Sequence, residues 1–341
     1  MNQSRDLLER TGNAFPFPDE AFERLSHRRD RRSRNRRLGA FAIVAAIGIA
    51  AALIGAGVLA TENDRTYGDE EPPPAPIAPS KSDFYVDVRN GAATPLPSSL
   101  EDAYFLVVSP DGTRVAYNPC CTRPVAGFVA NVDGTGVREV TSPLVDAYGP
   151  RWSPDGSSIV YQGRDAASIG VGDIFVLDLA TGTSRQVTDL GQQQHPWWFL
   201  SPSFASDGRS IIFHRPREQG PLVWDLWSVP ATGGKASLVR RNAGFGVYSP
   251  DGGSIAYLSP IESDFTGTEL LVVGVGGGTP RALVQGDGIT WPRWSPDGTR
   301  IAYGRLGHIF VVDVSTGRSE RLANGDVPEW FDDQTLIVGQ A

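Results

Sequence analysis

The chain has 341 residues and a formal net charge of −8, with 40% hydrophobic and 21% charged residues. Its 39 Gly and 26 Pro favour many short strands joined by turns over long helices. Residues 1–37 carry ten Arg and six acidic residues, whereas residues 38–341 carry 21 basic and 33 acidic residues. So acidic a domain argues against nucleic acid as a partner, because phosphates require a basic surface.

Residues 38–60 form an uncharged apolar run of 23 residues, long enough as a helix to cross a bilayer with some tilt. Arginines crowd the segment before this run, and acidic residues follow it. The positive-inside rule therefore predicts a cytoplasmic segment (1–37), one transmembrane helix (38–60) in the cell membrane, and an extracytoplasmic remainder. A cleaved signal peptide is the alternative, although the run exceeds the usual apolar region of about 7–15 residues.

Residues 61–82 contain five prolines among acidic residues and alanines. This composition is typical of a stiff, extended linker of the polyproline type. The chain is therefore expected to divide near Ser82 into a tether and a folded domain, residues 83–341.

A repeated tetrapeptide organises this domain. Four copies of Ser-Pro-Asp-Gly and one Ala-Ser-Asp-Gly variant are spaced by 44, 52, 44 and 46 residues; they begin at Ser109, Ser153, Ala205, Ser249 and Ser295. A degraded sixth copy begins at Phe331. Pro fixes φ, Asp bonds back to nearby amides and Gly tolerates positive φ, so each copy predicts a tight hairpin. The aspartates are interpreted as turn formers, against the alternative of a carboxylate cluster.

Each turn lies between two short apolar strands, and two further strands follow before the next copy. Four strands per repeat of about 40–45 residues predict the blades of a β-propeller. The sixth repeat has only two strands, while residues 83–97 match the third and fourth strands of the fifth repeat. We therefore expect an all-β, six-bladed propeller whose last blade combines two C-terminal with two N-terminal strands, which removes free sheet edges.

These hairpins, with a bulky residue before the Ser and a following Asp-Ile-Phe-Val-type strand, resemble the WD-like repeats of TolB-family propellers over residues 83–341. The resemblance implies a protein-binding module of the cell envelope. Similar repeats precede the hydrolase domain of prolyl oligopeptidase-like enzymes, but no Gly-x-Ser-x-Gly elbow occurs in this sequence. TolB itself has an additional N-terminal α/β domain, where this chain has the predicted membrane anchor.

In a propeller, the loops between second and third strands and the loops between blades share one face, called here the loop face, opposite the tetrapeptide turns. The segment 192–199 is the most distinctive of these loops. Gln193, His195, Trp197 and Trp198 are candidate ligand-binding residues, because rings offer contact area and polar side chains offer hydrogen bonds. Packing of the tryptophans between blades is the alternative.

Arg151, Arg293 and Glu329 occupy equivalent positions two residues before a turn. They either line the channel mouth as ligand-binding residues or form an internal salt bridge. Cys120 and Cys121 are adjacent in a domain expected outside the cytoplasm, where a vicinal disulfide competes with a free or intermolecular pair. The four histidines show no ligand spacing with these sulfurs, so we expect neither a metal site nor a cofactor.

Three functions remain open at this point. The first is a non-catalytic, membrane-anchored module that recognises an envelope protein, peptide or glycan on its loop face. The second is a transmembrane signalling protein, with apolar residues between 15 and 25 contacting a cytoplasmic partner; alternatively, residues 1–37 only set topology and contact anionic lipids. The third is a propeller-type lyase or glycosidase, which requires His195, His214 or His308 to converge with acids.

Overall fold

The computed structural model describes residues 84–119, 125–141, 145–165, 172–190, 199–217, 223–260 and 266–339. The predicted cytoplasmic segment, transmembrane helix and linker lie outside these ranges. Within them, no helix is long and apolar enough to span a membrane. Regular structure in the described ranges is β, apart from the short 3-10 helix η1 (Ser98–Leu100).

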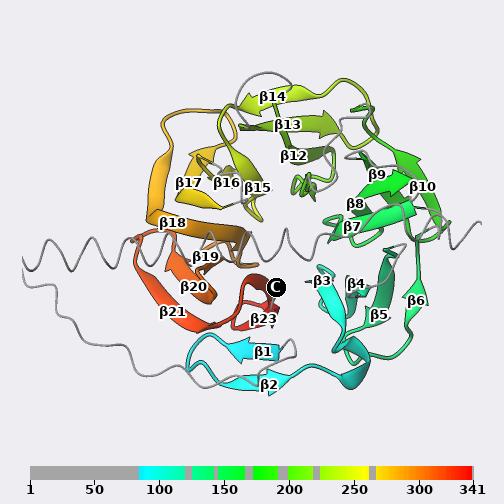
Figure 1. Cartoon of the computed structure of the whole chain (residues 1–341), viewed down its shortest axis with the longest axis horizontal. Helices are drawn as coiled ribbons and strands as arrows, with labels where there is room; N and C mark the ends of the chain where they lie inside the picture. Colours follow the sequence, from blue (N-terminus) through cyan, green and yellow to red (C-terminus); the bar gives the residue numbers. More distant parts are fainter. Residues whose placement is uncertain are drawn as a thin grey trace, which may run out of the picture. The chain divides into compact units, whose positions relative to one another are not determined.

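The described strands form five sheets that surround a central axis in sequence order (Figure 1). The first repeat contains β3 (Ala103–Val108), β4 (Arg114–Pro119), β5 (Phe128–Asn131) and β6 (Arg138–Glu139). The second contains β7 (Val145–Trp152), β8 (Ser158–Asp165), β9 (Asp173–Asp178) and β10 (Thr183–Gln186). The third contains β11 (Ser203–Phe204), β12 (Ser210–Pro216), β13 (Trp224–Pro230) and β14 (Ser237–Arg240).

The fourth and fifth repeats share one seven-stranded sheet, because the long strand β18 (Arg281–Trp294) pairs first with β17 and then with β19. The fourth repeat contains β15 (Gly244–Tyr248), β16 (Ser254–Leu258), β17 (Gly267–Gly274) and the first half of β18. The fifth contains the second half of β18, β19 (Arg300–Arg305), β20 (His308–Asp313) and β21 (Ser319–Asn324).

The closing sheet joins the two ends of the domain in the order β2-β1-β23-β22. Its strands are β1 (Phe84–Asp87), β2 (Ala93–Pro95), β22 (Val327–Asp332) and β23 (Thr335–Gly339). β1 pairs antiparallel with β23, from Phe84 opposite Val338 to Asp87 opposite Thr335. The predicted pairing of N-terminal with C-terminal strands is therefore confirmed. Pro95 lies in the outer strand β2, where a residue without an N–H is tolerated at a sheet edge.

The tetrapeptide turns use their aspartates internally, as predicted. In the four Ser-Pro-Asp-Gly copies the Ser hydroxyl donates to the Asp carboxylate at 2.5–2.6 Å. The Gly of each described turn adopts positive φ, between 67° and 73°. These hydrogen bonds hold the pKa of Asp111 at about 2, with the Ser109 hydroxyl as the largest cause. The carboxylates thus stabilise hairpins, and the alternative of a carboxylate cluster is not needed to explain them.

The core is distributed between neighbouring sheets rather than concentrated at one centre. Among the described residues, five of six buried apolar clusters draw side chains from two adjacent repeats or from the closing sheet and its neighbour, and the sixth draws them from the third, fourth and fifth repeats. Three tryptophans that precede turns add an equivalent hydrogen bond between repeats. Trp152, Trp294 and Trp330 donate through Nε1 to the carbonyls of Val107, Val247 and Arg293, at 3.1, 3.2 and 3.0 Å.

Candidate functional site

The axis is lined by the innermost strand of each repeat. Each of these strands runs from the loop face to a tetrapeptide turn, so residues further before the turn lie closer to the loop face. Two positions on these strands, two and four residues before the turn, carry the features of interest. In Figure 1, β3, β7 and β15 surround the axis, and β6, β10 and β14 lie at the rim.

Arg151, Arg293 and Glu329, at the first of these positions, meet at the axis. Nε of Arg293 donates to Oε2 of Glu329 at 3.0 Å, and Nη1 of Arg151 lies 3.8 Å from the same oxygen. The three side chains are 14%, 7% and 19% exposed for Arg151, Arg293 and Glu329, respectively. The internal salt bridge that the sequence left open as one alternative is therefore present. Because Arg151 and Glu329 come from sheets separated by the first repeat, this contact spans the axis.

The cluster carries an excess of positive charge. Burial raises the pKa of Glu329 to about 7, and the positive charge of Arg151 opposes that rise. Burial also lowers the pKa of Arg151, against the attraction of Glu329. The net charge of the cluster is therefore +1 with Glu329 ionised and +2 with it protonated. One guanidinium nitrogen of Arg293, Nη2, is buried without a hydrogen-bond partner in the described chain, although the guanidinium carbon lies 5.9 Å from the centre of the Trp291 ring.

Residues four positions before the turns adopt the left-handed backbone conformation in all five numbered repeats. Their φ values are 52° for Phe105, 59° for Gly149, 44° for Ser201, 52° for Phe245 and 48° for Trp291. In four of these repeats the inner strand has an irregular register at this point. Left-handed φ is uncommon for residues other than Gly and costs on the order of 1–3 kcal/mol, so its repetition identifies a position that the surrounding structure must enforce.

Three of these left-handed residues belong to an aromatic collar, defined as Phe105, Phe199, Phe245 and Trp291. Ring centres are 5.5 Å apart for Phe105 and Trp291, 4.9 Å for Phe245 and Trp291, and 5.8 Å for Phe105 and Phe199. All three contacts have the edge-to-face geometry that aromatic pairs prefer. The collar joins the first, fourth and fifth repeats and the segment before the third, so it crosses the axis between the loop face and the charged cluster.

Two small cavities flank the collar. One, of about 10 Å³, is lined by residues that include Phe105, Phe199, Trp291 and Arg151. The other, of about 20 Å³, is lined by residues that include Phe105 and Glu329. Each has room for about one water molecule. The collar and the charged cluster are therefore in contact with the same narrow axial space.

Buried polar side chains of the preceding repeat hold the inner strands beside the collar. Asn118 accepts from the N–H of Gly149 at 3.2 Å, and its amide donates to the carbonyl of Ala147 at 2.8 Å. Gln162 accepts from the N–H of Leu200 at 2.8 Å. These side chains stand at the fifth residue of the second strand in their repeats. They satisfy buried backbone groups of the inner strand or of the segment that precedes it.

His214 is the third of these polar supports. Its Nδ1 accepts from the N–H of Phe245 at 3.2 Å, and its ring contacts those of Phe245 and Trp224 at 4.5 and 5.1 Å. Burial lowers the pKa of His214 to about 3, while the backbone of Phe199 favours the protonated form. The imidazole is therefore neutral at physiological pH, as an acceptor Nδ1 requires.

The remaining sequence-based candidates have different outcomes. Gln193, His195, Trp197 and Trp198, and likewise Cys120 and Cys121, lie outside the described residues, so their roles stay predictions. His308 hydrogen-bonds Asn324 at 3.0 Å, and His214 is enclosed by aromatic rings; these two histidines do not converge with acids. The described ranges contain no group of three His, Cys, Asp or Glu residues placed to hold a metal ion.

Sequence reasoning missed the collar and its polar supports. The signals were nevertheless present. The residues four positions before the turns are Phe, Gly, Ser, Phe and Trp. The fifth residues of the second strands include Asn, Gln and His, where the other repeats have Leu or Gly. Neither set follows the two-residue alternation of a regular strand, so pattern analysis gave no reason to place their side chains at the axis.

Comparison with known structures establishes the type of fold. A putative TolB from Agrobacterium tumefaciens superposes with a TM-score of 0.59 at 18% identity, covering 75% of this chain and 96% of that one. TolB from Acinetobacter baumannii gives a TM-score of 0.55 at 16% identity, covering 72% and 63%. The domain is a TolB-like β-propeller. At these identities the likeness shows the fold alone.

Curated sequences add distant relatives. An uncharacterised protein of Agrobacterium fabrum is 27% identical over 234 residues, covering 63% of this chain and 75% of that protein. Dipeptidyl-peptidase 5 of Porphyromonas gingivalis is 22% identical over 314 residues, covering 68% of this chain but 43% of the peptidase. The chain thus spans less than half the length of that enzyme. No protein-family model matches the chain.

Proposed function

We propose that this chain is a non-catalytic binding module, a six-bladed TolB-like propeller held outside the cytoplasm by one membrane helix, that recognises a protein, peptide or glycan on its loop face. Five turn-centred repeats and the closing sheet support the count of six blades. The anchor and the orientation rest on the apolar run at 38–60 and the arginines that precede it.

The aromatic collar is the observation that carries this proposal. Its rings come from repeats far apart in sequence and converge at the loop-face side of the axis, above a cluster with excess positive charge. Apolar packing alone does not explain left-handed conformations at three aromatic residues. Each such conformation costs free energy, and regular strands would bury the same rings without that cost. Clustered rings with an arginine within reach are typical of sites where binding energy concentrates.

The proposal is tested by photo-crosslinking in intact cells. A benzophenone amino acid replaces Tyr148, a half-buried residue whose ring centre lies 6.2 Å from that of Phe199. The control places it at Thr113, the exposed residue that follows the first tetrapeptide turn on the opposite face. We expect a discrete envelope adduct from position 148 that is absent from position 113 and that disappears when Trp291→Ala is added.

Digestion of the adduct with a protease or with glycosidases distinguishes a polypeptide from a glycan ligand. Equal labelling at both positions, or an adduct that persists in the Trp291→Ala chain, would refute recognition at the axis.

A further inference from the structure

Three arginines of the outer strands pair in one register with the third strands of their repeats. Arg138 of β6 is paired with Val129, Arg185 of β10 with Val176, and Arg281 of β18 with Val272. Each partner valine stands at the same position of the third strand. The three arginines are therefore structurally equivalent and face the next repeat at the rim of the propeller.

Two of these arginines connect their repeat to the next one. Arg185 donates through Nη2 to the carbonyl of Ala231 at 2.8 Å. Arg281 donates to the carbonyls of Val314 and, at 3.2 Å, Ser315. Ala231 and Val314 are equivalent, because the N–H of each donates to the carbonyl of the residue that follows a tetrapeptide turn. The N–H of Leu179 makes the same hydrogen bond in the second repeat, so the carbonyl of Leu179 is the expected acceptor for Arg138.

Arg138 makes no side-chain hydrogen bond or ion pair within the part of the chain that the structure describes. The adjacent turn also stands away from β6. A Cβ built on Gly317, in the turn beside Arg281, lies 3.8 Å from the carbonyl oxygen of Leu283, whereas one built on the equivalent Gly182 has no atom within 4 Å. The junction between the first and second repeats is therefore open where the equivalent junction is closed.

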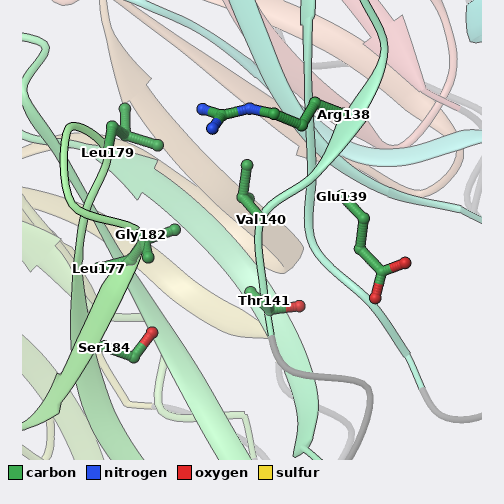
Figure 2. Close-up of a pocket in the computed structure, with 8 residues that line it drawn as sticks. All are labelled: Arg138, Glu139, Val140, Thr141, Leu177, Leu179, Gly182 and Ser184. Atoms are coloured by element: carbon green, nitrogen blue, oxygen red, sulfur yellow. The ribbon is translucent and has the colours of Figure 1, made fainter.

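The opening is a groove of about 380 Å³, called here the rim groove. Its lining includes Arg138 and Glu139 from the first repeat with Val140 after them, and Leu177 and Leu179 from the second. Figure 2 shows the Arg138 side chain extending over the groove towards Leu179, with Val140 beneath it and the Glu139 carboxylate pointing away. The groove thus offers an aliphatic floor beneath a guanidinium whose donors find no acceptor among the described residues.

We propose that the rim groove binds an extended peptide segment of a partner protein. A main-chain carbonyl oxygen of that segment accepts from Arg138, and an aliphatic side chain packs against Val140 and Leu179. This contact is separate from the axial site and goes beyond the function proposed above.

Charge complementarity and the equivalent junctions identify this occupant. Where the junction is closed, the acceptor of the arginine is a main-chain carbonyl of the neighbouring turn, so the electrostatic partner that fits the open guanidinium is another peptide carbonyl. β6 is the outer strand of its sheet and is only two residues long. The N–H of Val140, which follows β6, donates inward to the carbonyl of Gly127. Regular alternation therefore directs the main-chain groups of Glu139 outward, at the edge where an extended segment can add to the sheet.

The test uses the full-length chain and a phage-displayed library of random 12-residue peptides. Peptides that the chain enriches are synthesised, and their affinities are measured for wild type, Arg138→Ala and the matched control Arg185→Ala. We expect Arg138→Ala and a second groove variant, Leu179→Ser, each to weaken binding about tenfold, the effect of losing one charge-assisted hydrogen bond or one aliphatic contact. Arg185→Ala is expected to bind like wild type, as is Trp291→Ala, so failure at the axis and failure at the rim are distinguishable.

Thermal unfolding of the same variants shows whether Arg138 is free in solution. Loss of its hydrogen bond to Ala231 should lower the Tm of Arg185→Ala by about 2–4 °C, whereas Arg138→Ala should unfold at the wild-type temperature. The proposal is overturned if Arg138→Ala lowers the Tm as much as Arg185→Ala does. Such a result would mean that Arg138 already hydrogen-bonds the second repeat in solution. The proposal is also overturned if no peptide is enriched, or if the enriched peptides bind Arg138→Ala and wild type equally.

Discussion

Replacing His214 by Asn should make the domain resistant to acid. The ordinary pKa of a histidine is 6.5, and burial lowers that of His214 to about 3. Between these values the unfolded chain binds a proton at this residue and the folded chain does not. The stability that neutral His214 contributes is therefore fully present above pH 6.5 and is lost as the pH falls towards 3. At about 1.4 kcal/mol per pKa unit, the loss is on the order of 5 kcal/mol.

Asn is the informative substitution because Asn118 already performs this role in the first repeat, accepting from the N–H of Gly149 at 3.2 Å. His214→Asn should keep an acceptor for Phe245. It removes ring contacts with Trp224 and Phe245, which should cost about 1–3 kcal/mol at pH 7.5.

The assay is urea unfolding at a series of pH values between 7.5 and 3.5. Wild type should lose stability steadily below pH 6.5, and His214→Asn should lose much less. Asn118→Ala removes the equivalent acceptor in the first repeat without removing a titratable group, so it serves as the control and should keep the wild-type slope. An unchanged slope in His214→Asn would show that His214 is protonated in the folded domain and that its Nδ1 does not support Phe245.

Three further expectations concern the axis and the ring. Glu329→Gln should act with the opposite sign. Folding raises the pKa of Glu329 from 4.5 to about 7, so the stability that protonated Glu329 contributes is present below pH 4.5 and is lost as the pH rises through 7. The substitution should therefore flatten that part of the profile of stability against pH measured by urea unfolding. Trp152→Phe should cost about 1 kcal/mol in urea unfolding through loss of the hydrogen bond from Nε1 to the Val107 carbonyl. Removing residues 83–97 should abolish the cooperative unfolding transition, because β23 loses its partner; shortening the segment 61–82 should leave the transition unchanged.

The part of the fold that sequence predicted is the part that local chemistry determines. A Ser-Pro-Asp-Gly turn forms from contacts within four or five residues, so its copies located the hairpins and, by their spacing, the repeats. The pairing of β1 with β23 was also predictable, since residues 83–97 match strands whose position in a repeat was already known. The convergence of Arg151, Arg293 and Glu329 followed in part, from their equivalent positions before the turns.

The collar was not predictable because it depends on tertiary structure. Phe105, Phe245 and Trp291 have left-handed backbones only where a neighbouring repeat, or a packed ring, compensates for the irregular register. The rim groove is hidden for a different reason. Arg138 and Arg185 are the same residue type in the same register, and what separates them is the placement of the neighbouring turn, which no pattern in either repeat encodes.

The closing sheet also determines how the domain responds to mechanical force. β1 lies between β2 and β23, with four residue pairs to β23 and three to β2. A pull on the preceding chain along β1 therefore loads these hydrogen bonds in shear, so that they resist together instead of opening one at a time. Because β23 belongs to the same sheet, the force passes directly to the C-terminal strands. A tension applied at residue 84 thus loads the closing sheet first.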